Sequence, residues 1–172
     1  MLDLFSGTGG ASSAMRERGW RVVRVELDRS HRPDVVGDVA RLPIRGQFDL
    51  IWASPPCTEY SRSILPWIKG PAPDRSLWQA ARDAIALLRP RWWVIENVRG
   101  ASKWWGSPVR TYGPIFLWGD FPDFDAVVPP FKERLSGKDV AKRAATPRQV
   151  SLALALACER EAALLPMGEA CA

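Results

Sequence analysis

The chain has 172 residues, of which 47% are hydrophobic and 25% are charged, a composition typical of one globular domain and not of a disordered segment. Lysine and arginine number 24 against 19 aspartates and glutamates, and the resulting formal net charge of +5 favours a polyanionic partner. No apolar run is long enough to cross a membrane and no signal-peptide pattern is present. We therefore expect a cytoplasmic protein, in a bacterial or phage-infected host cell, with no membrane partner and no leader.

Short apolar runs alternate with helical patterns along the first hundred residues. Residues 1–5 predict a strand, residues 11–19 a helix that Gly19 closes, and residues 20–28 and 48–54 two further strands. Residues 74–90 have apolar positions at helical spacing up to Pro90, and residues 91–98 predict another strand. This alternation predicts an α/β, Rossmann-like fold with a mostly parallel sheet and helices on both faces.

The amino-acid composition changes after Gly100. Residues 102–131 are rich in glycine, proline and aromatic residues, which predicts short strands and loops instead of helix. Residues 132–145 are basic and polar, and residues 146–165 predict a helix with Thr146 as its N-cap and Pro147 in its first turn. No repeat and no linker appear, so residues 1–172 are expected to form a single domain with a short irregular segment at about 99–145.

The three cysteines lie far apart in the sequence, at Cys57, Cys158 and Cys171, without a CxxC pair. An odd, unpaired set argues against a disulfide framework and against a zinc site. His31 is the single histidine, so a histidine-based metal cluster is not expected either. The compartment is expected to be reducing, which would keep a free thiol available.

Unusual residues gather at the carboxyl ends of the predicted strands, where open α/β sheets bind ligands. The glycines of "DLFSGTGG" (residues 3–10) allow a ligand to approach the backbone, Glu26 can accept hydrogen bonds from two ribose hydroxyls, and Asp38 suits an exocyclic amine. Taken singly, the glycine loop is equally well an ordinary tight turn, and each acid is more often a solvated loop residue. Together they favour an adenosine-containing cofactor without a pyrophosphate, and S-adenosyl-L-methionine fits that description.

The loop "SPPCTEYS" (residues 54–61) holds Cys57 directly behind two rigid prolines. A thiolate in this position can attack carbon 6 of a cytosine, which makes the otherwise unreactive carbon 5 nucleophilic. The "ENV" that begins at Glu96 then offers a carboxyl group that can act as a general acid on ring nitrogen 3. The alternatives are a buried inert cysteine, which suits Cys158 and Cys171 better, and a glutamate that caps a neighbouring loop.

These motifs, in this order, resemble the cytosine-5 DNA methyltransferase family. "DLFSGTGG" resembles its first motif, "VELD" and "GDV" its second and third, "SPPCTEYS" its proline-cysteine loop, "WVIENV" its glutamate motif, and "TPRQVSLALALA" a weaker form of its last. The resemblance implies a class I methyltransferase fold and a methyl transfer from S-adenosyl-L-methionine, with S-adenosyl-L-homocysteine as product. The acceptor would be carbon 5 of a cytosine flipped out of double-stranded DNA, held through a covalent Cys57 adduct.

The resemblance also implies roles for single residues. Cys57 would be the nucleophile and Glu96 the acid, with Pro56 shaping the loop. The residues that would bind the cofactor are Phe5, Ser6, Gly7, Gly9, Gly10, Glu26, Leu27, Asp38, Val39 and Pro55.

The chain departs from the family in two ways. The family's QxRxR motif, whose arginine contacts the flipped base, is missing, and Arg62, Arg99 or Arg110 could substitute. We take Arg99, next to the glutamate motif, as the catalytic candidate. The long recognition domain is also missing, so recognition is either short or supplied by a protein partner. This compact form resembles small phage enzymes, and the sequence does not indicate an oligomeric state.

Candidate DNA contacts lie beside these motifs. Trp104 and Trp105, next to Lys103, could stack on bases, and the basic run at 132–143 could contact phosphates or be solvated surface. The remaining candidates are Ser61, Arg62 and Arg110. The tryptophans expected in the core are Trp20, Trp52, Trp92 and Trp93.

Two other functions remain open from the sequence. One branch of the same family modifies transfer RNA, so RNA is an alternative substrate. A catalytically idle nucleic-acid-binding protein is the other alternative, favoured by the missing arginine motif and disfavoured by intact Cys57 and Glu96. An amino-group methyltransferase would carry an aromatic residue in place of Cys57.

Overall fold

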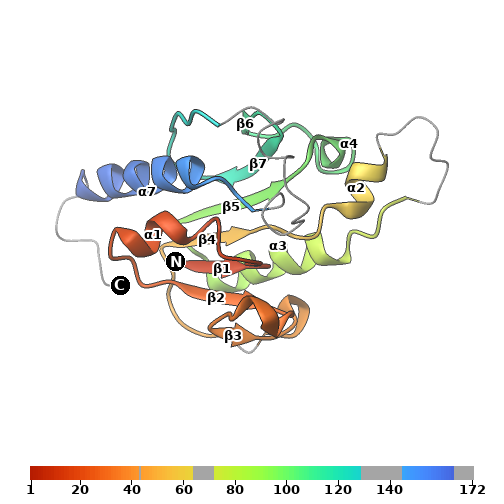
Figure 1. The fold of residues 1–172 in the computed structure, drawn as a ribbon, viewed down its shortest axis with the longest axis horizontal. Helices are drawn as coiled ribbons and strands as arrows, with labels where there is room; N and C mark the ends of the chain where they lie inside the picture. The colour runs from red at the N-terminus through yellow and green to blue at the C-terminus, as the bar shows by residue number, and fades with distance from the viewer. Residues whose placement is uncertain (43, 64–71, 129–144, 165–172) are drawn as a thin grey trace.

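The structure is a computed structural model that describes residues 1–42, 44–63, 72–128 and 145–164 (Figure 1). Its strands form one sheet in the order β3-β2-β1-β4-β5-β7-β6. β1 to β5 are parallel wherever they pair, whereas β7 runs antiparallel to both β5 and β6. The strands are β1 (Leu2–Leu4), β2 (Val23–Glu26), β3 (Val35–Val36), β4 (Leu50–Ala53), β5 (Trp92–Asn97), β6 (Arg110–Tyr112) and β7 (Ile115–Asp120).

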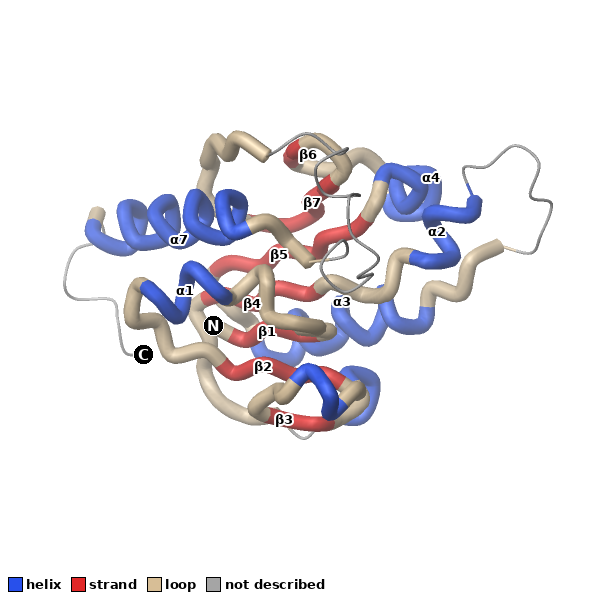
Figure 2. The backbone as a smooth tube through the Cα atoms, viewed as in Figure 1, coloured by secondary structure: helices blue, strands red, loops and turns tan. Residues whose placement is uncertain are grey.

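Helices and short 3₁₀ turns connect these strands. The helices are α1 (Ser13–Glu17), α2 (Thr58–Ser63), α3 (Ser76–Leu88), α4 (Ser102–Trp105) and α7 (Arg148–Ala163). The 3₁₀ turns are η1 (Arg29–His31), η2 (Val39–Arg41) and η3 (Arg99–Ala101). Figure 2 shows α1 and α7 side by side on one face of the sheet.

The central strand β4 divides the core into two layers, because successive side chains of a strand point to opposite faces. Leu50 and Trp52 pack into the layer that α1 and α7 cover, where Leu154 of α7 lies. Ile51 and Ala53 pack into the layer that α3 covers. All four β4 side chains are fully buried, as expected for a parallel strand covered on both faces.

The structure confirms the α/β, mostly parallel sheet and corrects four details. Residues 102–105, expected in a loop, form helix α4 after the turn η3, which supplies a local run of helical backbone. The N-cap of α7 is Pro147 and not Thr146, and the cap position makes no side-chain hydrogen bond. Trp20 precedes β2 and is only partly buried, and the two-residue strand β3 was not anticipated. No helix in the described ranges is long and apolar enough to cross a membrane.

Candidate active site

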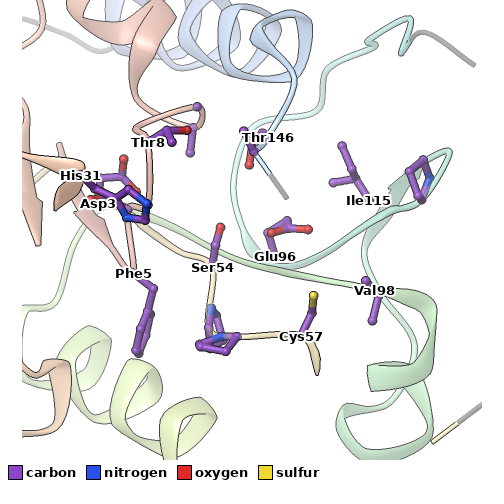
Figure 3. Close-up of a pocket in the computed structure, with 18 residues that line it drawn as sticks. Asp3, Phe5, Thr8, His31, Ser54, Cys57, Glu96, Val98, Ile115 and Thr146 are labelled. Carbon is purple, nitrogen blue, oxygen red and sulfur yellow. The ribbon is translucent and has the colours of Figure 1, made fainter. Parts of the chain in front are cut away.

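A cavity of about 260 Å³ opens at the carboxyl ends of β1, β4 and β5. In the view of Figure 3, Asp3, Phe5 and His31 lie on one side of it and Cys57 and Glu96 on the other. The predicted residues that line the cavity are Phe5, Ser6, Gly7, Gly10, Pro55, Pro56, Cys57 and Glu96. Residues outside that prediction also line it, including Asp3, Thr8, His31, Ser54, Val98 and Thr146.

The glycine loop, residues 5–10, turns sharply from β1 toward α1. Gly7 and Gly9 have φ values of +48° and +84°, which glycine adopts without strain. A Cβ on Gly10 would lie 2.6 Å from the carbonyl oxygen of Thr146, so only glycine lets the segment before α7 close over this loop. Phe5 itself has a φ of +55°, a strained conformation for a bulky residue, which places its ring at the cavity.

Asp3 lies at the base of the cavity with a fully buried carboxyl group. Its Oδ2 accepts a hydrogen bond of 2.5 Å from the Ser12 hydroxyl, while its Oδ1 has no hydrogen-bond partner. Burial raises the pKa of Asp3 to about 7, against the opposing effects of the Ser12 hydrogen bond and the charge of Arg24. Sequence reasoning placed Asp3 only at a strand end; an acid in an otherwise apolar strand was the signal it missed.

Glu26 and its neighbours form the end of β2 beside the glycine loop. One carboxylate oxygen of Glu26 accepts the N–H of Gly7 at 2.8 Å, and the other accepts the N–H groups of Leu27 and Asp28 at 2.8 and 3.2 Å. Glu26 thus ties the loop to β2 in addition to any role toward a ligand. The side chain of Leu27 is 70% exposed, which leaves an apolar surface beside this carboxylate.

Asp38 and Val39 begin the turn η2. The carboxylate of Asp38 accepts the N–H of Ala40 at 3.0 Å and caps this turn, while Val39 is buried in the core layer below. Neither is among the residues that line the cavity, nor are Gly9, Glu26 and Leu27. Their roles in cofactor binding remain predictions.

The loop that carries Cys57 is held from both neighbouring strands. The indole N–H of Trp52 donates a 2.7 Å hydrogen bond to the hydroxyl of Ser54. Asn97, which is buried at the end of β5, donates from its side-chain amide to the carbonyl of Pro55 at 2.9 Å. The same Asn97 accepts the N–H of Val98 at 2.9 Å, so the end of β5 and the proline-cysteine loop are fixed together.

Cys57 lies directly before α2 with its thiol partly buried, and Glu96 faces the same cavity (Figure 3). Burial raises the pKa of the Cys57 thiol above its ordinary value, and the charge of Glu96 raises it further. A hydrogen bond with the side chain of Ser61 acts in the opposite direction. The thiol is therefore protonated at neutral pH. Ser61 interacts with the cysteine, and its predicted contact with DNA remains a prediction.

Of the candidate arginines, neither Arg99 nor Arg110 lines the cavity. Arg99 begins the turn η3, is exposed and is not among the lining residues. Arg110, at the start of β6, forms an exposed ion pair with Asp123. Arg62 lies in α2, but its side chain is outside the described part of the structure.

Trp105, predicted as a base-stacking residue, is partly buried and packs against other aromatic side chains, and its stacking on bases remains a prediction. Its ring stacks on Trp78 with a centroid distance of 4.0 Å and meets the rings of Tyr60 and Trp118 edge-on at 4.8 and 5.1 Å. Neighbouring residues of α4 remain more accessible: Lys103 is exposed, with its ammonium 5.1 Å from the ring centroid of Trp104.

His31, which sequence reasoning weighed only as a metal ligand, lines the cavity from the turn η1. Its Nδ1 is buried and has no hydrogen-bond partner. The described residues contain no group of three or more histidines, cysteines, aspartates or glutamates placed to hold a metal ion. The position of His31 after a strand end was the signal that could have assigned it to this site.

The chain is 34% identical over 112 residues to a protein of Frog virus 3 (isolate Goorha) named "Probable DNA (cytosine-5)-methyltransferase", an alignment that covers 56% of the chain and 52% of the viral protein. The chain thus spans about half the length of the curated relative it matches. No family model matches the chain.

Among solved structures, one match is an E. coli protein provisionally named a DNA modification methyltransferase encoded within a prophage. The TM-score is 0.44 at 25% identity, over 58% of this chain and 32% of that one. The sequence similarity to the viral protein agrees with the order of the motifs along the chain. In sequence, the chain is therefore similar to the cytosine-5 DNA methyltransferases, the family that its motifs resemble.

Proposed function

We propose that this protein is an S-adenosyl-L-methionine-dependent DNA methyltransferase that acts on carbon 5 of a cytosine flipped out of its duplex. The observation that carries the proposal is the single cavity lined by Cys57, Glu96 and the glycine loop. A nucleophile and an acid beside a surface suited to a small ligand are the groups that this reaction requires. The similarity to the viral protein supports cytosine in DNA as the acceptor.

The residues of the cavity fit the proposed cofactor. The unpartnered Oδ1 of Asp3 can accept a hydrogen bond from a cationic group, and the strained glycine loop exposes backbone to the methionine part. Glu26 would accept from the ribose and Leu27 would pack on the adenine. Bound there, S-adenosyl-L-methionine would supply an electrophilic methyl group and leave as S-adenosyl-L-homocysteine.

In the proposed chemistry, the thiol of Cys57 gives up its proton to water, and its sulfur forms a bond to carbon 6 of the cytosine. The ring electrons that this addition displaces are stabilised at nitrogen 3 by a hydrogen bond from the carboxyl group of Glu96, and carbon 5 becomes nucleophilic. After carbon 5 gains the methyl group, its proton passes to water. The bond between sulfur and carbon 6 then breaks, which restores the aromatic ring and returns Cys57 as a thiolate.

The electrostatics of the site give Glu96 a second effect on Cys57. While Glu96 is ionised, its charge raises the pKa of the thiol and disfavours the attacking thiolate. A Glu96 carboxyl group that holds a proton against nitrogen 3 no longer exerts this effect. We propose that the thiolate forms mainly once the base is bound, which would protect Cys57 from reaction in the absence of DNA.

The proposed partner is double-stranded DNA, and its contacts would lie outside the cavity. Arg99 and Lys103 are exposed on consecutive short elements that follow Val98, which itself lines the cavity. We propose that these two side chains, with Arg110, contact phosphates beside the flipped base. A protein partner that supplies sequence recognition remains part of the proposal.

The direct test is transfer of a labelled methyl group from S-adenosyl-L-methionine to duplex DNA and to RNA of matched cytosine content. Transfer to DNA that disappears in Cys57→Ser is expected. Transfer to RNA alone would move the assignment to an RNA cytosine methyltransferase. No transfer to either, with S-adenosyl-L-methionine binding intact, would favour the catalytically idle alternative.

A further inference from the structure

Arg24 is a charged residue within the parallel part of the sheet. It lies on β2, where its backbone is in register with Asp3 of β1, and it is only 9% exposed. Burying a guanidinium in a sheet is costly unless its donors find acceptors. The acceptors that Arg24 finds all belong to the segments that shape one side of the cavity.

The guanidinium joins two separate loops through their backbone carbonyls. One terminal nitrogen donates to the carbonyl of Gly7 in the glycine loop at 2.5 Å and to that of His31 in η1 at 3.2 Å. The other terminal nitrogen reaches the carbonyl of Arg32 at 3.4 Å. Gly7 and His31 both line the cavity, so a single side chain sets the spacing between them.

The glycine loop is shaped to admit this side chain. A Cβ on Gly9 would lie 2.9 Å from Nε of Arg24 and 3.1 Å from the central carbon of its guanidinium. Gly9 also has a φ of +84°, so a side chain there would be strained as well as crowded. Gly9 does not line the cavity itself; its lack of a side chain makes room for Arg24 beneath the loop.

Arg24 also acts on the carboxyl group at the base of the cavity. The groups that influence Asp3 are the hydroxyl of Ser12, the positive charges of Arg24 and Arg16, and the negative charge of Glu26. Arg24 favours the ionised form of Asp3, whose Oδ1 has no partner within the protein. Its charge therefore helps the cavity to present a carboxylate to a cationic ligand.

We propose that Arg24 is a positioning residue for the cofactor: its guanidinium holds the glycine loop against the turn η1 and keeps Asp3 available for the positively charged end of the ligand. This inference rests on the proposed function. A lysine would not replace Arg24, because an ammonium is a point donor, whereas the planar guanidinium reaches carbonyls in two loops at once.

The test measures the binding of S-adenosyl-L-homocysteine by calorimetry to the unsubstituted chain, Arg24→Met and Arg24→Lys, at a temperature where each is folded. We expect both substitutions to weaken binding at least tenfold. Arg18→Met is the matched control, because Arg18 is an exposed arginine that pairs with Glu159 on α7, and it should bind as the unsubstituted chain does. Unchanged affinity in Arg24→Met would overturn the inference.

The pH dependence separates positioning from a general loss of structure. Binding to the unsubstituted chain should strengthen as the pH rises through about 7, where the pKa of Asp3 lies. Without the charge of Arg24 this pKa moves up, so the rise should shift to higher pH in Arg24→Met. Arg24→Lys retains a charge and should keep the rise near its original pH while binding more weakly; an unshifted profile in Arg24→Met would contradict the electrostatic part.

A second measurement makes the two proposals separable. If the unsubstituted chain binds no S-adenosyl-L-homocysteine, the proposed function fails, but hydrogen exchange of the backbone amides still tests whether Arg24 joins the two loops. Faster exchange at residues 6–10 and 29–34 in Arg24→Met than in Arg18→Met is expected. Equal exchange in these segments would contradict the positioning role.

Discussion

Cys57 and Glu96 influence one another through charge, and this coupling can be measured without any DNA. Glu96→Gln removes a negative charge that raises the pKa of the Cys57 thiol, so a larger fraction of the thiol should ionise. Alkylation of Cys57 by iodoacetamide at pH 8 should become roughly two- to fivefold faster, because the thiolate is the reactive form. Methyl transfer should fall sharply in the same variant.

Peptide mass mapping would locate the alkylation and exclude the buried Cys158, the pKa of which burial raises to about 12. A Glu96→Gln variant that alkylates more slowly than the unsubstituted chain would contradict the proposed coupling between the two residues.

The ionised carboxylate of Asp3 is expected to lower the stability of the fold and to strengthen cofactor binding. Unfolded, its carboxyl ionises near pH 4, whereas in the folded protein its pKa is about 7, so it destabilises the fold progressively as the pH rises from 4 to 7. An asparagine at this position would not ionise and could still accept the hydrogen bond from Ser12. Asp3→Asn should therefore gain stability relative to the unsubstituted chain across this range, by up to a few kcal/mol at pH 7.

Urea denaturation at pH 4, 5, 6 and 7 would give the difference in free energy of unfolding directly. The same variant should bind S-adenosyl-L-homocysteine more weakly at pH 8, because the carboxylate is lost. A stability difference that stays constant with pH would show that Asp3 is already ionised in the folded protein near pH 4.

The helix α4 packs against an aromatic cluster beside the loop that carries Cys57. Trp105→Ala would remove a ring that touches Trp78, Tyr60 and Trp118, and we expect a loss of about 3 kcal/mol in the free energy of unfolding. Trp104→Ala, in the same helix but without these ring contacts, should cost clearly less. DNA affinity measured well below the unfolding temperature should change little in Trp105→Ala; a selective loss of DNA binding with normal stability would support the base-stacking role.

The helix α7 closes the layer above α1 mainly through apolar contacts. Leu154 is fully buried in that layer, so Leu154→Ala should lower the free energy of unfolding by about 2–5 kcal/mol. Leu156, in the same helix but 39% exposed, provides the control, and Leu156→Ala should cost much less. Denaturation curves with unchanged slope would assign the difference to stability, and equal losses would contradict the observed packing.

Much of these elements could be predicted from sequence patterns. The continuous apolar run of β4 and the helical spacing of α3 gave the type and approximate place of each, because burial on both faces or on one stripe leaves a periodic trace. Helix α4 could not be predicted, since its four residues are stabilised by aromatic contacts with distant segments and not by a local pattern. The antiparallel pairing of β7 with β5 also depends on contacts between separate segments of the chain.

Across the whole molecule, the site is a consequence of parallel strand direction. β1, β4 and β5 all end at the same edge of the sheet, which brings the glycine loop, Cys57 and Glu96 to one cavity although they are spread over more than ninety residues. The sequence motifs therefore pointed to Cys57, Glu96 and most of the glycine loop, which line the cavity, whereas Glu26 and Asp38 lie outside its lining. Asp3, Arg24 and His31 were not predicted as site residues. Their roles come from burial, from side-chain atoms without a hydrogen-bond partner and from hydrogen bonds to backbone carbonyls, which only the folded chain reveals.

The central claim is that Cys57 forms a covalent bond with a cytosine during methyl transfer. The most direct measurement mixes the protein with S-adenosyl-L-methionine and duplex DNA that carries 5-fluorocytosine, followed by a denaturing gel. Because fluorine cannot leave carbon 5 as a proton does, turnover should stop at the adduct and give a shifted band that is absent in Cys57→Ala. The absence of a band with the unsubstituted chain, under conditions where both ligands bind, would contradict the account.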